Sequence, residues 1–167
     1  MIKCVSRKCR QIIYDTTYNL KQLFNLIVTN SYIIIPVYRK KIFYFYVLRK
    51  LIKKTEYEGR YSFVIGDNLK DKNPYNYYYS KDGIIDYTEK ELNLFEGILD
   101  VIVYGKDYKN AVSFFGKLSL NNQKILNKFE VINVYVDKDF YGDKYFDLIK
   151  LYYKGENIKK IYIEDIL

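Results

Sequence analysis

Residues 32–48 read YIIIPVYRKKIFYFYVL, two runs of β-branched and aromatic residues that three basic residues separate. Such runs are typical of β-strands, so we expect strands at 32–38 and 42–48. The basic residues 39–41 then form the tip of a hairpin between them. Pro36 has no N–H to donate to a strand ladder, which favours an edge position or a bulge there.

The second of these strands is apolar on both faces. With regular alternation, one face carries four apolar or aromatic side chains and the other carries three. The two sets are Ile42, Tyr44, Tyr46 and Leu48, and Phe43, Phe45 and Val47. A strand that is apolar on both faces indicates a position in the core of a sheet.

The rest of the chain mixes helix and strand patterns without regular alternation. Apolar spacing and capping residues predict helices at 15–30, 88–95, 111–118 and after Ser119. Strand patterns lie at 61–65, 98–104, 131–136 and in a C-terminal hairpin of 145–153 and 158–163. A helix at 143–153 is the alternative for the first arm of that hairpin. We therefore expect an α+β fold, with a mostly antiparallel sheet of about five to seven strands and three or four helices, in a single compact domain.

Positive charge is concentrated in the first part of the chain. Residues 1–60 carry thirteen Lys and Arg against three acids, a net charge of +10, and the remaining residues carry −2. Within one domain (1–167) we distinguish a basic half (1–65), an irregular tyrosine-rich loop (66–83) and a mildly acidic half (84–167).

The charge is densest at 39–54, RKKIFYFYVLRKLIKK, which has seven basic residues and no acid. Clustered positive charge attracts polyanions, and exposed aromatic rings stack on nucleobases. The tract therefore predicts nucleic-acid contact through its basic side chains. These are Arg39, Lys40, Lys41, Arg49, Lys50, Lys53 and Lys54. The alternative is a buried strand whose charged ends are solvated.

Tyrosine is concentrated at 73–80, NPYNYYYS, within the irregular loop. Because tyrosine offers a large contact area at low entropic cost, this loop predicts a surface for a partner protein. The candidate partner-binding residues are Tyr75, Tyr77, Tyr78 and Tyr79.

The composition, dominated by residues with AT-rich codons, is typical of an AT-rich genome such as that of a virus or mobile element. We expect a non-catalytic protein that binds a macromolecular partner, a protein such as a host-defence or virion component in preference to nucleic acid. Sequence-tolerant nucleic-acid binding through the basic tract is the alternative.

Several kinds of catalysis are excluded by residues that the chain lacks. It has no histidine, which rules out Ser-His-Asp and Cys-His sites, and it has neither a Walker A nor a G-x-G-x-x-G motif. We expect no catalytic residue, no metal site and no cofactor. A magnesium-dependent nuclease is a second alternative, since Asp86, Asp107 and Lys109 loosely fit a D…(D/E)-x-K pattern. Asp137 and Asp139 form another carboxylate pair after a strand, for which a solvated turn is the simpler interpretation.

The two cysteines, Cys4 and Cys9, are too few for a disulfide framework or a zinc site without histidine. We interpret both as free thiols of a reducing compartment. The N-terminus has no apolar segment typical of a signal peptide, and no apolar run is long enough to span a membrane. The sequence therefore predicts an intracellular, cytoplasmic protein.

Overall fold

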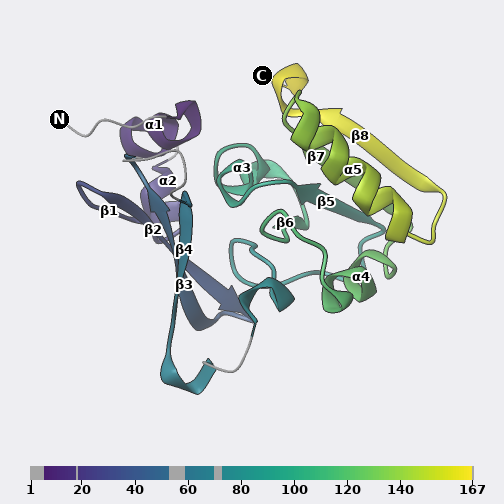
Figure 1. Ribbon diagram of the computed structural model, residues 1–167, viewed down its shortest axis with the longest axis horizontal. Coiled ribbons are helices and arrows are strands. Elements are labelled where there is room, and N and C mark those ends of the chain that lie inside the picture. Colours follow the sequence, from purple (N-terminus) through teal and green to yellow (C-terminus); the bar gives the residue numbers. More distant parts are fainter. Residues whose placement is uncertain (1–5, 18, 53–58, 70–72, 167) are drawn as a thin grey trace. The chain divides into compact units, whose positions relative to one another are not determined.

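The computed structural model describes residues 6–17, 19–52, 59–69 and 73–166. The chain divides into an N-terminal unit, residues 1–72, and a C-terminal unit, residues 73–167. The α+β class expected from the sequence is confirmed. Its strands form one four-stranded antiparallel sheet and one four-stranded parallel sheet (Figure 1).

The N-terminal unit is built on the antiparallel sheet, whose strands follow one another in space as they do in the chain. Its described elements are α1 (Arg7–Tyr14), α2 (Leu20–Leu23), β1 (Ile27–Val28), β2 (Tyr32–Arg39), β3 (Ile42–Lys50), β4 (Tyr61–Ile65) and a 3-10 turn (Asp67–Leu69). The strands β2, β3 and β4 confirm three of the strands expected from the sequence. The helix expected at 15–30 is wrong beyond its first turn, because Asn25 adopts a left-handed conformation (φ 53°) and the chain then enters β1.

The hairpin between β2 and β3 turns through only two residues, Lys40 and Lys41. Both have positive φ, 51° and 66°, as a type I′ turn requires. Two lysines thus occupy positions where Asn-Gly is the usual pair.

A bulge follows the hairpin and changes which side chains share a face. Val37 pairs with Phe45, but Tyr38 pairs with Phe43, so Tyr44 is an extra residue in β3. The regular alternation expected for β3 is therefore wrong at its start. Phe43 lies on the same face as Tyr46, and their ring centroids are 4.5 Å apart.

One face of this sheet forms the interior of the N-terminal unit. Five apolar side chains on this face are at most 1 % exposed and come from alternate positions of β2 and β3. They are Ile33, Ile35 and Val37 with Phe45 and Val47. Cys9 is also buried and is a free thiol, as expected, whereas Cys4 lies outside the described residues.

The C-terminal unit is built on the parallel sheet, with strand order β6-β5-β7-β8. Its elements are a 3-10 turn (Pro74–Asn76), β5 (Glu91–Phe95), α3 (Ile98–Val103), a 3-10 turn (Gly105–Asp107), β6 (Ala111–Ser113), α4 (Leu120–Leu126), β7 (Val131–Val136), α5 (Phe140–Tyr152), β8 (Asn157–Tyr162) and a final 3-10 turn (Ile163–Ile166). Helix α5 lies along β7 and β8 (Figure 1), and its Tyr145 and Ile149 join the core formed by the sheet.

Four expected elements of this unit are wrong. Residues 88–95 contain β5 in place of a helix, 98–104 form α3 in place of a strand, and 111–118 contain β6 in place of a helix. Residues 145–153 belong to α5, which was the alternative. For β5 and β6 the tertiary setting overrides local propensity, because short strands of a parallel sheet are buried on both faces and lack a clear alternation. By contrast β7, β8 and the Ser119-capped helix α4 confirm their predictions.

Candidate functional site

Three carboxylates gather at the carboxyl-terminal ends of two neighbouring strands. Glu96 directly follows β5, and Asp137 and Asp139 follow β7. The two strands are parallel, with Phe95 opposite Tyr135, so their ends lie at the same edge of the sheet. The backbone N–H of Asp137 donates to Oε2 of Glu96 at 3.4 Å, which brings the two chain segments into contact.

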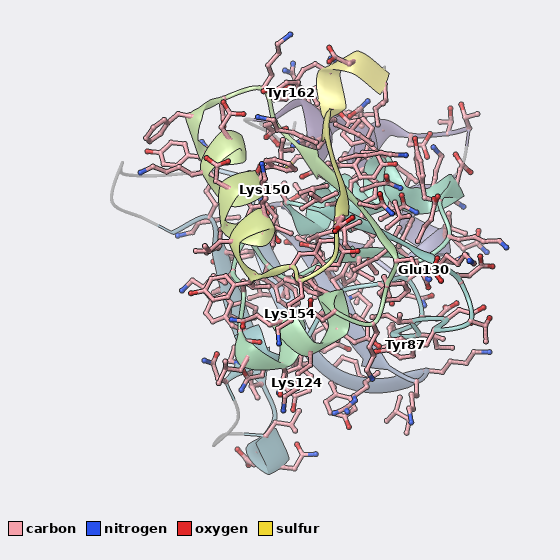
Figure 2. The ribbon with its side chains drawn as sticks, turned by 90° about the vertical axis from the view of Figure 1, so that its right-hand side faces the viewer. Tyr87, Lys124, Glu130, Lys150, Lys154 and Tyr162 are labelled. Atoms are coloured by element: carbon pink, nitrogen blue, oxygen red, sulfur yellow. The ribbon has the colours of Figure 1, made fainter. Side chains whose placement is uncertain are left out.

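This edge is also the point where the order of strands reverses. From β5 the chain crosses through α3 to β6 on one side, and then returns through α4 to β7 on the other side. Ligands of open parallel sheets bind outside the carboxyl ends of the strands at such a point. Figure 2 shows the two ends of the sheet, with Tyr162 at the carboxyl end of β8 and Glu130 and Lys154 at the other end.

Two glycines allow the close approaches on which the site depends. A Cβ on Gly97 would lie 2.7 Å from Oδ2 of Asp100, the oxygen that accepts a hydrogen bond from the Gly97 N–H. A Cβ on Gly142 would lie 2.2 Å from the carbonyl oxygen of Asp137. Glycine at these positions therefore lets α3 and α5 begin directly against the strand ends.

Helix α5 begins at the site and holds one of the three carboxylates. Asp139 is the N-cap of α5, and its Oδ1 accepts a hydrogen bond from the N–H of Gly142 at 2.8 Å. Its second oxygen is not required for the cap. Asp143, one turn later, instead pairs with Lys160 at 3.0 Å, which holds the pKa of Asp143 below its usual value.

The electrostatics of the site centre on Glu96. Burial, together with the nearby charges of Asp137, Asp100 and Asp139, raises the pKa of Glu96 to about 7, although a hydrogen bond from the Asp137 backbone acts in the opposite direction. Near neutral pH the site therefore holds a proton or requires a cation. Perturbed carboxyl groups of this kind are concentrated at functional sites.

The hydroxyl of Tyr145 interacts electrostatically with Glu96. Tyr145 is buried in α5, and burial together with the charge of Glu96 raises the pKa of its hydroxyl. Within the described part of the chain this hydroxyl has no hydrogen-bond partner. A buried polar group without a partner is uncommon, and a ligand or ordered water at the site would satisfy it.

The cluster fits a hard divalent cation in its donor atoms. Among the described residues, no three His, Cys, Asp or Glu side chains are arranged to hold a metal ion as they stand. Mg²⁺, however, is usually bound by one or two carboxylates, with water and substrate phosphates completing its shell. Two of the three carboxylates Glu96, Asp137 and Asp139 would therefore be enough to hold such an ion.

The basic residues of tract 39–54 are distributed over several environments. Arg39, Lys40 and Lys41 are exposed at the hairpin, and Lys50 is half-buried. Arg49 is only 5 % exposed, with its guanidinium 4.7 Å from the centre of the Tyr61 ring. Lys53 and Lys54 lie outside the described residues.

The four loop tyrosines pack onto the C-terminal unit. Tyr79 is 1 % exposed and its backbone pairs with that of Ser113. The hydroxyl of Tyr78 donates to the carbonyl of Gly83, and the ring of Tyr75 lies 4.1 Å from the Lys117 ammonium. Tyr77 is half-buried. Much of this aromatic surface thus stabilises the unit itself.

The residues of the expected nuclease pattern are engaged elsewhere. Lys109 forms an ion pair with Glu89, and Asp107 pairs with Lys106 at 3.1 Å. Asp86 caps a turn by accepting hydrogen bonds from Thr88. These pairings occupy the charges that the pattern needs for a cation.

The sequence singled out Asp137 and Asp139 but missed Glu96. The signal was present, since an acid followed by glycine ends the run LNLF just as Asp137 ends the run VINVYV. These acids at the ends of the two runs indicate a common site only once the runs are known to be neighbouring parallel strands.

No protein-family model matches the chain, and no curated protein matches its sequence. Solved structures do share its fold. A structure of the zinc-binding and RNA polymerase domains of the Aquifex aeolicus primase has 14 % identity and a TM-score of 0.60, over 96 % of this chain and 44 % of that one. A DNA primase domain from Pseudomonas aeruginosa has 15 % identity and a TM-score of 0.60, over 95 % and 55 %.

A DnaG primase catalytic domain bound to single-stranded DNA has 14 % identity and a TM-score of 0.53, over 94 % of this chain and 54 % of that one. The chain thus spans about half the length of these structures. At such identities the likeness establishes the fold. In the described part of the chain, no helix is both long and apolar enough to span a membrane.

The likeness corrects two expectations from the sequence. A non-catalytic protein whose partner is another protein was expected, but the fold is shared with catalytic domains of primases. The expectation that the chain is not an enzyme is contradicted by the same structures. The absence of histidine excludes only histidine-dependent sites and leaves carboxylate-bound metal chemistry open.

Proposed function

We propose that this chain is a metal-dependent enzyme of nucleic acids that transfers nucleotidyl groups, with primer synthesis on single-stranded DNA as the reaction to test first. The observation that supports this most directly is the convergence of Glu96, Asp137 and Asp139 at the strand-order reversal of the parallel sheet. The fold shared with primase catalytic domains gives the same indication.

In this proposal Glu96, Asp137 and Asp139 would hold a divalent cation. When bound, such a cation neutralises phosphate charge and stabilises the attacking and leaving oxygens of the transfer. Glu96 must release its proton to serve as a ligand, so its raised pKa makes binding weaker in acid. Asp139 both caps α5 and faces the site, which fixes the position of that carboxylate relative to the sheet.

In this proposal the basic N-terminal unit would attract nucleic acid. Among its described residues are ten Lys and Arg but only two acids, Asp15 and Asp67. Positive charge of this density attracts phosphate backbones whatever their sequence.

Cation binding is the first test. Titration with Mn²⁺, followed by electron paramagnetic resonance, is expected to give a saturable site in the wild type and none in Asp137→Ala/Asp139→Ala. Asp147→Ala, which removes an exposed acid on α5, is the matched control and should bind as the wild type does. Equal Mn²⁺ affinity in all three proteins would remove the proposal.

The reaction is tested with a single-stranded DNA template, labelled ribonucleotides and Mg²⁺. New labelled chains are expected for the wild type and Asp147→Ala, and none for Asp137→Ala/Asp139→Ala. Shortening of a labelled template, with the same dependence on Asp137 and Asp139, would instead assign phosphodiester hydrolysis to the site.

A further inference from the structure

Aromatic rings form a continuous row on the outer face of the N-terminal sheet, the face opposite the buried one. The rings of Tyr38 and Phe43 meet edge to face with centroids 6.2 Å apart, and those of Phe43 and Tyr46 are 4.5 Å apart. We call Tyr38, Phe43 and Tyr46 the aromatic row. The bulge at Tyr44 creates it, because only the extra residue brings Phe43 to this face.

The row is accessible and is surrounded by further apolar surface. Phe43 is 45 % exposed, and Tyr38 and Tyr46 are partly exposed. Val64 pairs with Tyr46 and is 50 % exposed, and Ile27 on β1 is 54 % exposed. Contiguous exposed apolar surface of this kind marks a binding site more often than a solvated one.

Basic residues lie at both ends of the aromatic row and favour a negatively charged ligand. Arg39, Lys40 and Lys41 are exposed at the hairpin beside Phe43, and Lys50 shares the face of Tyr46 further along β3. The two acids in the described part of this unit, Asp15 and Asp67, lie outside its strands. A ligand with flat apolar groups and regularly spaced negative charges matches both features, and single-stranded nucleic acid has both.

We propose that the outer face of β2, β3 and β4 binds single-stranded DNA, with bases stacked on the aromatic row and phosphates held by Arg39, Lys40 and Lys41. The choice of DNA rests on the proposed function, in which a DNA strand is the template. Duplex DNA is disfavoured as the ligand, because its bases are already stacked on each other. Arg49 is excluded from the surface because it belongs to the buried face, opposite Ile33.

The test is the affinity of the full chain for a fluorescein-labelled oligo(dT) of about 15 nucleotides, a length within the usual site size. Fluorescence anisotropy at 50 mM salt is expected to show that Phe43→Leu and Tyr46→Leu each weaken binding by about tenfold, the effect of one lost stacking contact. Leucine keeps the sheet face covered, so folding is preserved. Tyr46→Phe keeps a ring and should bind as the wild type does.

Tyr152→Leu is the matched control, since it removes a tyrosine of similar exposure, 42 %, from α5. Unchanged affinity in Phe43→Leu and Tyr46→Leu, or an equal loss in Tyr152→Leu, would overturn the inference. Equal binding of a duplex of the same length would overturn it as well.

The same assay separates this inference from the proposed function. Asp137→Ala/Asp139→Ala should bind oligo(dT) with wild-type affinity while it loses Mn²⁺. Loss of stacking-dependent DNA binding with an intact Mn²⁺ site would reject the inference alone. Intact DNA binding without a Mn²⁺ site would reject the proposed function alone.

Discussion

Replacement of Glu96 by glutamine should make the protein more stable at high pH. It should also remove the part of the pH dependence of stability that comes from Glu96. The ordinary pKa of a glutamate is 4.5, and in the folded protein that of Glu96 is about 7. Between these two values the folded protein holds a proton that the unfolded chain has released. The folded state is therefore favoured at low pH, and this advantage declines as pH rises from 4.5 to 7.

The size of the effect follows from the width of that interval. Because the Glu96 carboxylate is only half-buried, solvent screening reduces the full linkage energy, and we expect about 1–2 kcal/mol. Glutamine is neutral at every pH and avoids the cost of a buried charge. Glu96→Gln should thus exceed the wild type by about 1–2 kcal/mol in free energy of unfolding above pH 7, and match it below pH 4.5.

Urea unfolding between pH 4 and pH 8.5 measures this difference directly. Glu156→Gln, which changes an exposed glutamate in the turn before β8, should follow the wild-type curve throughout. Addition of Mg²⁺ above pH 7 should stabilise the wild type and leave Glu96→Gln unchanged. A pH profile of Glu96→Gln that parallels the wild type would show that Glu96 does not titrate in this interval, and the reasoning would fail.

Three further substitutions probe the hairpin and the support of the site. Lys40→Asn/Lys41→Gly relieves the backbone strain of two left-handed residues and should raise the free energy of unfolding by about 1–2 kcal/mol. The same variant should weaken oligo(dT) binding about 25-fold at 0.1 M salt, about fivefold for each lost phosphate contact. Stronger binding by this variant would exclude the hairpin from the DNA surface. Gly142→Ala places a methyl group against the carbonyl oxygen of Asp137. It should lower the free energy of unfolding, measured with urea, by about 1–3 kcal/mol and abolish Mn²⁺ binding. Unchanged Mn²⁺ affinity would show that this contact does not position Asp137. Tyr145→Phe removes a buried hydroxyl without a described partner, so it should raise the free energy of unfolding by about 1–2 kcal/mol and with it the melting temperature. A lower melting temperature would mean that the hydroxyl has a hydrogen-bond partner in solution.

The sequence predicts the N-terminal sheet well because that sheet is local. Strands β2, β3 and β4 are consecutive, and β2 and β3 join through a two-residue turn. The hydrophobic pattern of each strand can therefore be interpreted from the neighbouring sequence alone. Strand β1 and the bulge at Tyr44 escaped prediction. The extra residue of the bulge leaves no mark in a run of seven aromatic or apolar residues.

The C-terminal sheet is harder to predict because its pairings are distant in sequence. Strand β5 pairs with β7, some forty residues away, and β6 has only three residues. The β-branched run ILDVIV becomes α3 because Asp100 caps it through the Gly97 N–H and because all of its side chains are buried. Tertiary burial of this kind outweighs intrinsic propensity.

The site could be predicted only in part for the same reason. Asp137 and Asp139 were visible as a pair at the end of a strand, but a pair of acids in a turn is usually solvated and has no role at a functional site. Glu96 was not singled out, because the helix expected at 88–95 concealed the strand that it follows. Once β5 and β7 are parallel neighbours, one residue after each strand must lie at the same edge, and the three carboxylates become a single feature.

In the proposed function, the segregation of charge between the two units has a physical consequence. A carboxylate cluster repels phosphate, so the C-terminal unit, taken without a cation, is a poor place for a polyanion to bind. The net charge of +10 in residues 1–60 attracts phosphate backbones, and salt weakens this attraction. Near the site the half-buried Glu96 is screened less, and only a proton or a cation can neutralise it. In the proposed function, attraction of nucleic acid by the basic residues and neutralisation of the carboxylate cluster are therefore separate electrostatic tasks.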